Sequence, residues 1–501
     1  MELDLKMQEV GCCEAARRVV VSHEETMETA IPEYCPDVAR IVDTVGQLKI
    51  REKKMQGARL TINGTVRTTV LYTSEESAGL RSLTLSVPLS CTVDDERLRG
   101  CSSICGSGRL QMVEARAVGA RKIYIRAIVE FDVEGILCPE RRICCDVPED
   151  PALQVRRCQQ SVQMLSRVLE REFSFHQECR PGPDDGVPED LLLDRLTLRV
   201  TGCQRLNSKL IVKGEAALSL LYRTKEQRLD CCDLLLPFSQ VVDGADLPEQ
   251  AEYCPEIWVQ DSDVRLIRLD DGVGFGVSAR IGLVLKVYEQ KLLEYVEDLY
   301  SVTDEAKVER RCSEIPTPLP PEVLRQETVQ TLEFGQQEPF ACITALECSG
   351  VTIAQELDGT ALRTELRLQL LYLDESGTPV STERTAELEI HTPLHPEAAR
   401  AVCAPVIVHN GPNRCEIRIP VDFFLYRTEQ TRIDSVSAAE LLPDERGERP
   451  SVVLRRTEKG ESLWEIAKAY RTAPTVIESA NHLEQGAPLP GGMLLIPRVR
   501  T

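Results

Sequence analysis

Several groups of side chains in this 501-residue chain have the types that enzymes use for catalysis or metal binding. They are three acidic runs (Asp94-Asp95-Glu96, Asp184-Asp185 and Asp270-Asp271), a histidine pair (His391 and His395) and a cysteine pair (Cys101 and Cys105). The acidic runs lie among turn-forming residues, which favours solvated turns over an acid/base pair with shifted pKa values. Pro393 prevents the helix that would place both histidines on one face, and no histidine lies near the cysteines to complete a zinc site. The sequence therefore predicts no metal site.

The motifs of common enzyme classes are absent from the sequence. The chain has no Gly-x-Ser-x-Gly nucleophile elbow, no Walker sequence and no His-Glu-x-x-His pair, and none of its six histidines stands beside a candidate nucleophile. Gly272-x-Gly274-x-Gly276 lacks the following helix that a dinucleotide site requires, so we interpret it as a β turn. We therefore expect a protein that is not an enzyme and that binds no cofactor.

Residues 451–501 contain the elements that would position a binding site. Ser462 and Glu465 have the spacing of a capping box, which predicts the start of a helix. Thr472 is the expected cap of a second helix, and Pro474 lies at its start, where the missing N–H does no harm. The expected elements, in order, are a helix over 463–470, a helix over 474–481 and an apolar strand over 493–496.

This order of elements, with the run Gly460-Glu461-Ser462-Leu463-Trp464-Glu465-Ile466-Ala467, is similar to the LysM domain, a small β-α-α-β module that binds N-acetylglucosamine polymers. The resemblance implies that a partner or glycan binds between two loops. The corresponding residues are Lys459, Gly460, Glu461, Ser462 and Leu463 in the first loop and Asn481, His482 and Leu483 in the second, which extends to about Gly486. The module core is expected to contain Trp464, Ile466, Ile477, Leu495 and Ile496.

The chain before this module contains a repeat. Tyr72, Tyr222 and Tyr372 each end an apolar alternating segment, and they stand 150 positions apart. A polar turn and a second apolar segment follow each tyrosine, and a long alternating segment comes later, at 122–131, 276–285 and 415–424. Alternation with period two is typical of strands that have one buried face. The sequence therefore predicts three homologous antiparallel β domains.

The predicted domains are β repeats at 1–150, 151–312 and 322–441, a linker at 442–450 and the LysM module at 451–501. A helix is expected at the start of the second repeat, because Val155, Val162, Leu165 and Leu169 have roughly helical spacing. The prolines within 315–321 predict an extended joint before the third repeat. The expected fold class is mainly β, with one small α+β module at the C-terminal end.

Composition limits the partners and the compartment. The net charge of -21 argues against a nucleic-acid surface, because phosphate contacts need Lys and Arg. No apolar run has the length of a signal peptide or a membrane span, so we expect a cytoplasmic protein with no transmembrane segment. The twenty cysteines are then expected to be reduced and mostly buried.

Three β repeats followed by a LysM module resemble the SPOCS (DUF3794) family of spore-forming Firmicutes, in particular members from Clostridia that carry a LysM domain. Residues 31–38, Ile-Pro-Glu-Tyr-Cys-Pro-Asp-Val, resemble the Pro-Asp segment of that family. The resemblance implies a non-enzymatic adaptor in spore coat assembly, located in the mother-cell cytoplasm at the outer surface of the forespore. Its implied partner is the morphogenetic ATPase of the coat's basal layer. The alternative is a cell-wall or spore-wall protein that binds peptidoglycan through the same module.

Overall fold

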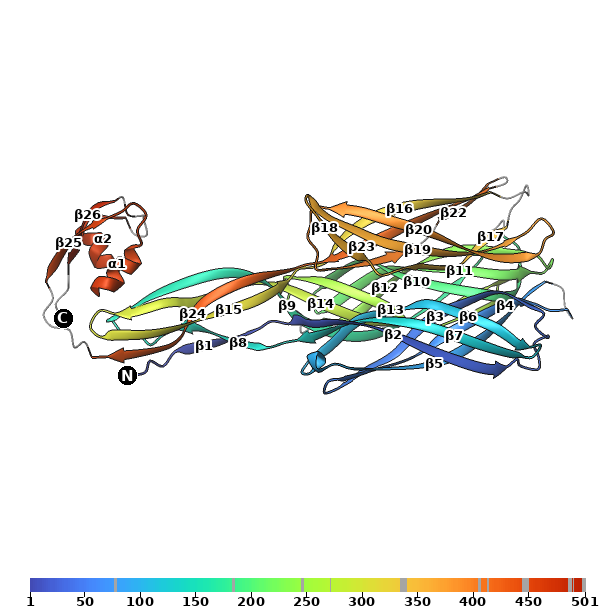
Figure 1. Ribbon diagram of the computed structural model, residues 1–501, viewed down its shortest axis with the longest axis horizontal. Helices are drawn as coiled ribbons and strands as arrows, with labels where there is room; N and C mark the ends of the chain where they lie inside the picture. The colour runs from blue at the N-terminus through green and yellow to red at the C-terminus, as the bar shows by residue number, and fades with distance from the viewer. Residues whose placement is uncertain are drawn as a thin grey trace.

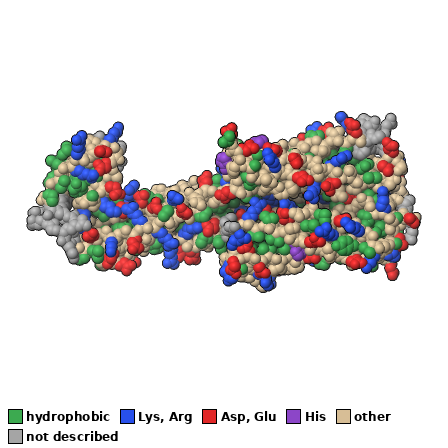
Figure 2. Space-filling view, viewed as in Figure 1, with side chains coloured by type: hydrophobic (Ala, Val, Ile, Leu, Met, Phe, Trp, Pro, Cys, Tyr) green, Lys and Arg blue, Asp and Glu red, His purple; other side chains and the backbone are tan. Residues whose placement is uncertain are grey.

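The computed structural model describes residues 1–497, with gaps at 76–78, 183–184, 245–246, 271, 334–339, 404–406, 412–413, 444–449, 485–488 and 490. Strands make up 76% of it and there are two helices, which confirms the mainly β fold class. The molecule is elongated, with a broad body of β sheets, a narrow stalk, and a small C-terminal module at the stalk's tip (Figures 1 and 2). Most of the predicted linker at 442–450 lies outside the described residues.

The first unit has two three-stranded sheets, β3-β4-β5 and β2-β7-β6, and one ribbon, β1-β8. Its strands are β1 (Lys6–Gly11), β2 (Glu14–Ala30), β3 (Arg40–Gln56), β4 (Arg59–Thr73), β5 (Leu80–Asp94), β6 (Ser103–Gly119), β7 (Lys122–Leu137) and β8 (Glu140–Asp146), with a 3₁₀ turn at Glu96–Leu98. The two sheets pack face to face around one apolar core, which includes Tyr72, Val87 and Phe131.

The second unit repeats this pattern with sheets β10-β11-β12 and β13-β14-β9. Its strands are β9 (Leu153–Cys179), β10 (Pro188–Leu206), β11 (Lys209–Thr224), β12 (Leu229–Asp243), β13 (Ala251–Leu269) and β14 (Gly272–Ser301). Here the ribbon has no strands of its own, because β9 and β14 continue without a break from the sheet into the stalk.

The third unit has the sheets β17-β19-β18, with β20 also paired to β19, and β16-β23-β21, with β22 also paired to β23. Its ribbon is β15-β24. The strands are β15 (Glu305–Pro318), β16 (Glu322–Glu333), β17 (Ala341–Cys348), β18 (Thr352–Glu356), β19 (Gly359–Leu373), β20 (Pro379–Thr392), β21 (Ala398–Cys403), β22 (Ile407–Gly411), β23 (Arg414–Tyr426) and β24 (Thr428–Leu442).

The three tyrosines occupy the central strands of equivalent sheets, β4, β11 and β19. The residue before each tyrosine points the other way and joins a buried cluster shared by all three units, which includes Leu71, Leu221 and Leu371. Each unit therefore has its own apolar core, and one further apolar cluster holds the three units together. The predicted limits of the three repeats stay predictions.

The stalk is built from the three ribbons, which pack their apolar faces against one another. Side chains from all three ribbons are buried there, including Val10, Ile143, Leu293, Ile315 and Ile433. A second cluster continues towards the tip, with Leu3, Leu153, Val296, Val436 and Leu441 among its members. The stalk is thus a continuous hydrophobic core surrounded by six strand segments.

Three local predictions were wrong. The helix expected over Val155–Leu169 is part of strand β9, which pairs with β14 over its whole length. The joint at 315–321 is extended, as expected, but Ile315–Pro318 pairs with β24 and so belongs to the stalk. The glycines at 272–276 begin strand β14 instead of forming a turn. The first two segments pair with strands more than 100 residues away in the sequence, whereas the glycines pair with the end of β13, which ends at Leu269.

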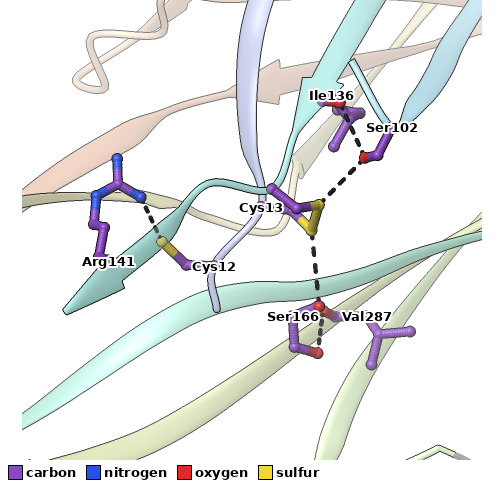
Figure 3. The surroundings of a disulfide bond; sticks show 8 residues. Cys12, Cys13, Ser102, Ile136, Arg141, Ser166 and Val287 are labelled. Atoms are coloured by element: carbon purple, nitrogen blue, oxygen red, sulfur yellow. Dashed lines mark hydrogen bonds between the residues drawn. A yellow bond between two sulfur atoms is a disulfide. The ribbon is translucent and has the colours of Figure 1, made fainter. Parts of the chain in front are cut away.

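One cysteine pair also differs from the prediction of reduced thiols. Cys13 and Cys138 form a disulfide (Figure 3). The β2-β7 register places Glu14 opposite Leu137, so the residues just outside this pair face each other, with Cα atoms 4.0 Å apart. The neighbouring Cys12 keeps its thiol, and Arg141 Nη1 donates to its sulfur at 2.8 Å. The disulfide lies where the ribbon of the first unit leaves its sheet.

Replacing both Cys13 and Cys138 with serine removes a link between residues 125 positions apart. We expect the free energy of unfolding of the first unit to fall by about 2–4 kcal/mol, because the link restricts the unfolded chain. Thermal unfolding without reductant measures the change. Cys145→Ser, which affects no described disulfide, is the control. Equal melting temperatures for the double variant and the unmodified protein would contradict the expectation.

Candidate binding site at the C-terminal module

The C-terminal module consists of β25 (Val452–Thr457), α1 (Leu463–Tyr470), α2 (Pro474–Ala480) and β26 (Gly492–Pro497). This confirms the predicted order of elements. Ser462 caps α1, and its side chain accepts a hydrogen bond from the Glu465 N–H at 3.4 Å. Thr472 does not cap α2 as predicted: the N-cap is Ala473, while the Thr472 hydroxyl donates to the Pro497 carbonyl at 2.9 Å.

The module core differs from the prediction at one strand position. Ile466, Ile477 and Ile496 are buried as expected, but Leu494 is buried instead of Leu495. The reason is the alternation of β26, in which residues 494 and 496 point towards the helices and residue 495 is only half-buried. Trp464 is only partly buried, and it packs against this core.

The first candidate loop is held by its own side chains. Gly460 has a φ of 82°, a left-handed conformation that glycine adopts without strain. Glu461 pairs with Arg455 of β25, and its other oxygen accepts the Glu458 N–H at 3.3 Å. Lys459 is exposed and Leu463 packs against the module core. Lys459 is therefore the side chain of this loop with the most freedom to reach a ligand.

The second candidate loop begins with Asn481, whose side chain forms its hydrogen bonds within the module. The Asn481 amide donates to the carbonyls of Ile477 at 2.8 Å and Leu495 at 2.6 Å, and its oxygen accepts the Leu495 N–H at 2.7 Å. His482 is exposed with a φ of 56°, and Leu483 packs against the core. The rest of this loop, residues 485–488, lies outside the description.

A backbone contact connects the first loop to the segment beyond the second. The Gly460 N–H donates to the Leu489 carbonyl at 3.2 Å, and Gly491, with a φ of 80°, lies against the backbone of Lys459. Of the eight predicted site residues, Glu461 and Asn481 therefore shape the loops, Leu463 and Leu483 support them, and Lys459 and His482 offer exposed side chains. The arrangement provides backbone groups and a few polar side chains, as a glycan or a protein surface would require.

The family comparison agrees with this geometry. Residues 456–497 match the LysM domain family model. The match includes both candidate loops, and it associates the module with carbohydrate or peptidoglycan binding. No match to a SPOCS (DUF3794) family model accompanies it, so that resemblance stays a prediction for the three β units. No curated protein is significantly similar to the chain.

The LysM module is docked on the stalk through one buried carboxylate. Asp298 of β14 is 1% exposed, and both of its oxygens accept hydrogen bonds from the Lys468 ammonium at 2.8 Å. Trp464 Nε1 donates to the same carboxylate at 2.8 Å, and Arg310 of β15 pairs with it at 2.7 Å. A buried carboxylate requires such partners, because an unpaired charge in the interior is very costly. Helix α1 supplies two of the three.

Aromatic and backbone contacts complete this docking surface. The rings of Tyr300 and Trp464 meet edge to face with centroids 5.0 Å apart. The Tyr300 hydroxyl donates to the Thr472 carbonyl at 2.7 Å, and Arg471 lies 3.7 Å from the Glu305 carboxylate. Trp464 packs against the module core, as the sequence predicted, and in addition contacts Tyr300 and Asp298 of the stalk.

Sequence analysis missed Asp298 and Tyr300. A register shift between Val296 and Asp298 and the burial of the consecutive residues 298–301 interrupt the alternation of β14 there, so no periodic signal marked Asp298 as an inward carboxylate. Its partners Trp464 and Lys468 also lie 166 and 170 residues further along the chain.

The histidines with metal-binding spacing do not come together. His391 lies with Glu356 and Glu389 in an exposed group, whereas His395 contacts Gln355. Glu389 is already paired with Arg363, which reduces its capacity to hold a cation. Among the described residues, no helix has the length and apolar character of a membrane span.

Asp298→Asn is expected to weaken docking by roughly 2 kcal/mol. This lies below the approximately 3–5 kcal/mol typical of a broken buried pair, because the Lys468 and Arg310 side chains remain 31% and 45% exposed to water. Trp464 is one of two tryptophans, so its emission in a Trp258→Phe background measures docking. We expect a red shift for Asp298→Asn and none for Glu309→Gln, an exposed carboxylate on the same stalk. Unchanged emission in both would contradict this role of Asp298.

Docking should also depend on pH in the acid range. Burial acts to raise the pKa of Asp298, but hydrogen bonds from Lys468, Trp464 and Arg310 outweigh it, so the pKa is lowered. The stabilisation is therefore complete above the ordinary pKa of about 3.9 and is lost as the pH falls through the lower, docked-state value. Trp464 emission should stay constant from pH 7 to 5 and shift only below about pH 4. Release already at pH 6 would contradict this assignment, and Asp298→Asn should lack the acid-dependent step.

Proposed function

We propose that this protein is a non-enzymatic adaptor that presents a LysM module in a fixed orientation at the tip of a β stalk. The observation that carries the proposal is the docking of helix α1 on Asp298 and Tyr300. Docking uses the helix side of the module and leaves Lys459 and His482 of the two loops exposed. A module held in this way keeps side chains of both loops accessible to a partner, as an adaptor requires.

The first proposed ligand is a protein. The outer face of the two-stranded β25-β26 sheet carries large apolar side chains in water: Val452, Leu454 and Met493 are 52%, 64% and 64% exposed. Arg456 pairs in register with Met493, which adds a charge to this face. Apolar anchors beside a charged group are typical of protein interfaces, and a glycan would not require them.

The finer form of this proposal follows from the resemblance to LysM-bearing SPOCS proteins. In that form the partner is the morphogenetic ATPase of the spore coat's basal layer, and the protein acts in the mother-cell cytoplasm at the forespore surface. The β units would then attach the protein to other coat components. The acidic body, with a net charge of -21 for the chain, suits a soluble partner more than a phosphate surface.

The second candidate ligand is the glycan of peptidoglycan. The match of residues 456–497 to the LysM family favours it, since that family is associated with N-acetylglucosamine polymers. The loop between β25 and α1, with Lys459 and the backbone of Gly460, and the loop at His482 would form the contact. The two candidates use different faces of one module, so they can be separated by mutation.

Two variants of the full chain distinguish these faces. The sheet variant, Leu454→Ser with Met493→Ser, removes the apolar anchors of the β25-β26 sheet. The loop variant, Lys459→Glu with His482→Asn, changes the exposed side chains of the two loops. Asparagine is chosen because it tolerates the left-handed backbone at position 482. Calorimetric titration with the purified ATPase and with N-acetylglucosamine oligomers gives the affinities. We expect the sheet variant to bind the ATPase at least tenfold more weakly, which is a loss of about 1.4 kcal/mol in binding free energy.

The control is Lys307→Glu, an exposed charge reversal on the stalk. It should leave both affinities unchanged. Micromolar binding of the oligomers that is lost only in the loop variant would favour the glycan candidate instead. If neither variant affects binding of either ligand, the LysM module is not the contact and the adaptor proposal fails.

A further inference from the structure

A cleft of about 1110 Å³ lies where the three β units meet. All three units contribute to its wall, through β3 and β6 of the first, β10 and β13 of the second, and β17 and β21 of the third. These are edge strands of their sheets, so each sandwich turns an open side towards the same space. Figure 2 shows Lys and Arg side chains gathered in the hollow between the layers of the body. The proposed function makes no use of this cleft.

Most charged side chains of the wall are paired. Arg18 donates to Asp132 at 2.6 Å, Arg109 pairs with Glu130, and Lys49 pairs with Asp261 at 3.0 Å. Arg400 lines the same wall and forms no ion pair within the described part of the chain. Five cations and four carboxylates line the cleft, and Asp261 beyond the wall pairs with Lys49, so what distinguishes the cleft is the lack of close anionic partners at Arg195 and Arg400 among the described residues.

Arg195 is the cation whose charge is least satisfied. Its Nη2 donates to the Ser219 hydroxyl at 3.0 Å, while its Nε is buried with no acceptor among the described residues. Asp233 is near enough to act on this charge but forms no ion pair with it. Burial lowers the pKa of Arg195, which is the direction expected for a cation without a close anion. A guanidinium in this setting is costly unless an anion joins it.

Two further donors in the cleft lack an acceptor among the described residues, and one carboxyl group there is a poor acceptor. Arg109 Nε and Trp258 Nε1 are buried without an acceptor in the described structure. Glu347 also lines the cleft, and burial raises its pKa to about 7 despite the nearby Arg367 and Arg109. Burial therefore favours the neutral form of this carboxyl, which is a weaker partner for a cation than a carboxylate. The cleft thus has an excess of donors and a deficit of acceptors.

The rest of the wall is apolar. Leu235 of β12 lies on the same face of the sheet as Arg195 and Ser219, whereas Leu196, Leu198 and Leu218 belong to the core side of that sheet. Leu235 also lines the cleft and is 53% exposed, so part of this wall is in contact with water. Concave sites with apolar walls and a few directed polar groups are the usual form of small-molecule sites.

We propose that the cleft binds an organic acid, whose carboxylate or phosphate group pairs with Arg195 and whose apolar part lies against Leu235 on the same face of that sheet. The acid would supply the acceptors that Arg195 and its neighbours lack. Its contact with residues of all three units would also make binding stabilise the packing of the units against one another.

Titration of the full chain with octanoate, octyl phosphate and acetate at equal ionic strength tests this site. We expect octanoate or octyl phosphate to bind at least tenfold more tightly than acetate and to raise the melting temperature; the tighter of the two identifies the acidic group. Arg195→Gln should weaken this binding at least tenfold. Because the variant removes an unpaired buried charge, its melting temperature without ligand should equal or exceed that of the unmodified protein.

Two further variants complete the test. Leu235→Asp places a like charge at a half-exposed wall position and should also weaken binding without unfolding the protein. Arg268→Gln, an exposed arginine outside the cleft, should bind as the unmodified protein does. The proposal is overturned if neither amphiphile binds, or if binding survives in both Arg195→Gln and Leu235→Asp.

Discussion

The architecture depends on the pairing of the first strand of each repeat with its last. In the second unit this pairing runs from Cys179 opposite Phe275 to Leu153 opposite Ser301, without leaving the same two strands. It closes one sheet of the sandwich and then continues as a ribbon beyond it. Because all three repeats extend at the same end, three ribbons with one apolar face each can pack into a stalk. The common axis of the stalk also determines that the open sheet edges of the body face one another.

The strands of the body were largely predictable from alternation, and the exception has a physical cause. Residues of β9 pair regularly with β14 until Ser166, where one extra residue shifts the register between Val287 and Tyr288. Met164 and Leu165, which are consecutive, are both buried as a result. This bulge breaks the period of two. Val162 and Leu165 are therefore both buried although they are three residues apart, and such a spacing resembles that of a helix. A bulge depends on the partner strand, so one segment read alone could not reveal it.

The candidate site was predictable only where its determinants are local. The cap of α1 at Ser462 follows from a short sequence spacing, and it lies where the sequence placed it. Contacts between distant segments were not predictable. The Cys13–Cys138 link depends on the register of β2 and β7, and the partners of Trp464 depend on how the module lies against the stalk. In both cases local patterns indicated a buried or polar group and gave no information on what it touches.

The continuous strand β14 also sets the distance between the body and the LysM module. Its 30 residues, at about 3.3 Å per residue, span roughly 100 Å. One end of β14 lies in the body, and the other end holds Asp298 and the LysM module. The separation between contacts made at the two ends is therefore fixed by the length of the strand. Such a rod can engage two components only when their separation matches its length. The same protein would therefore discriminate between assemblies by the thickness of the layer that it spans, independently of the strength of either contact.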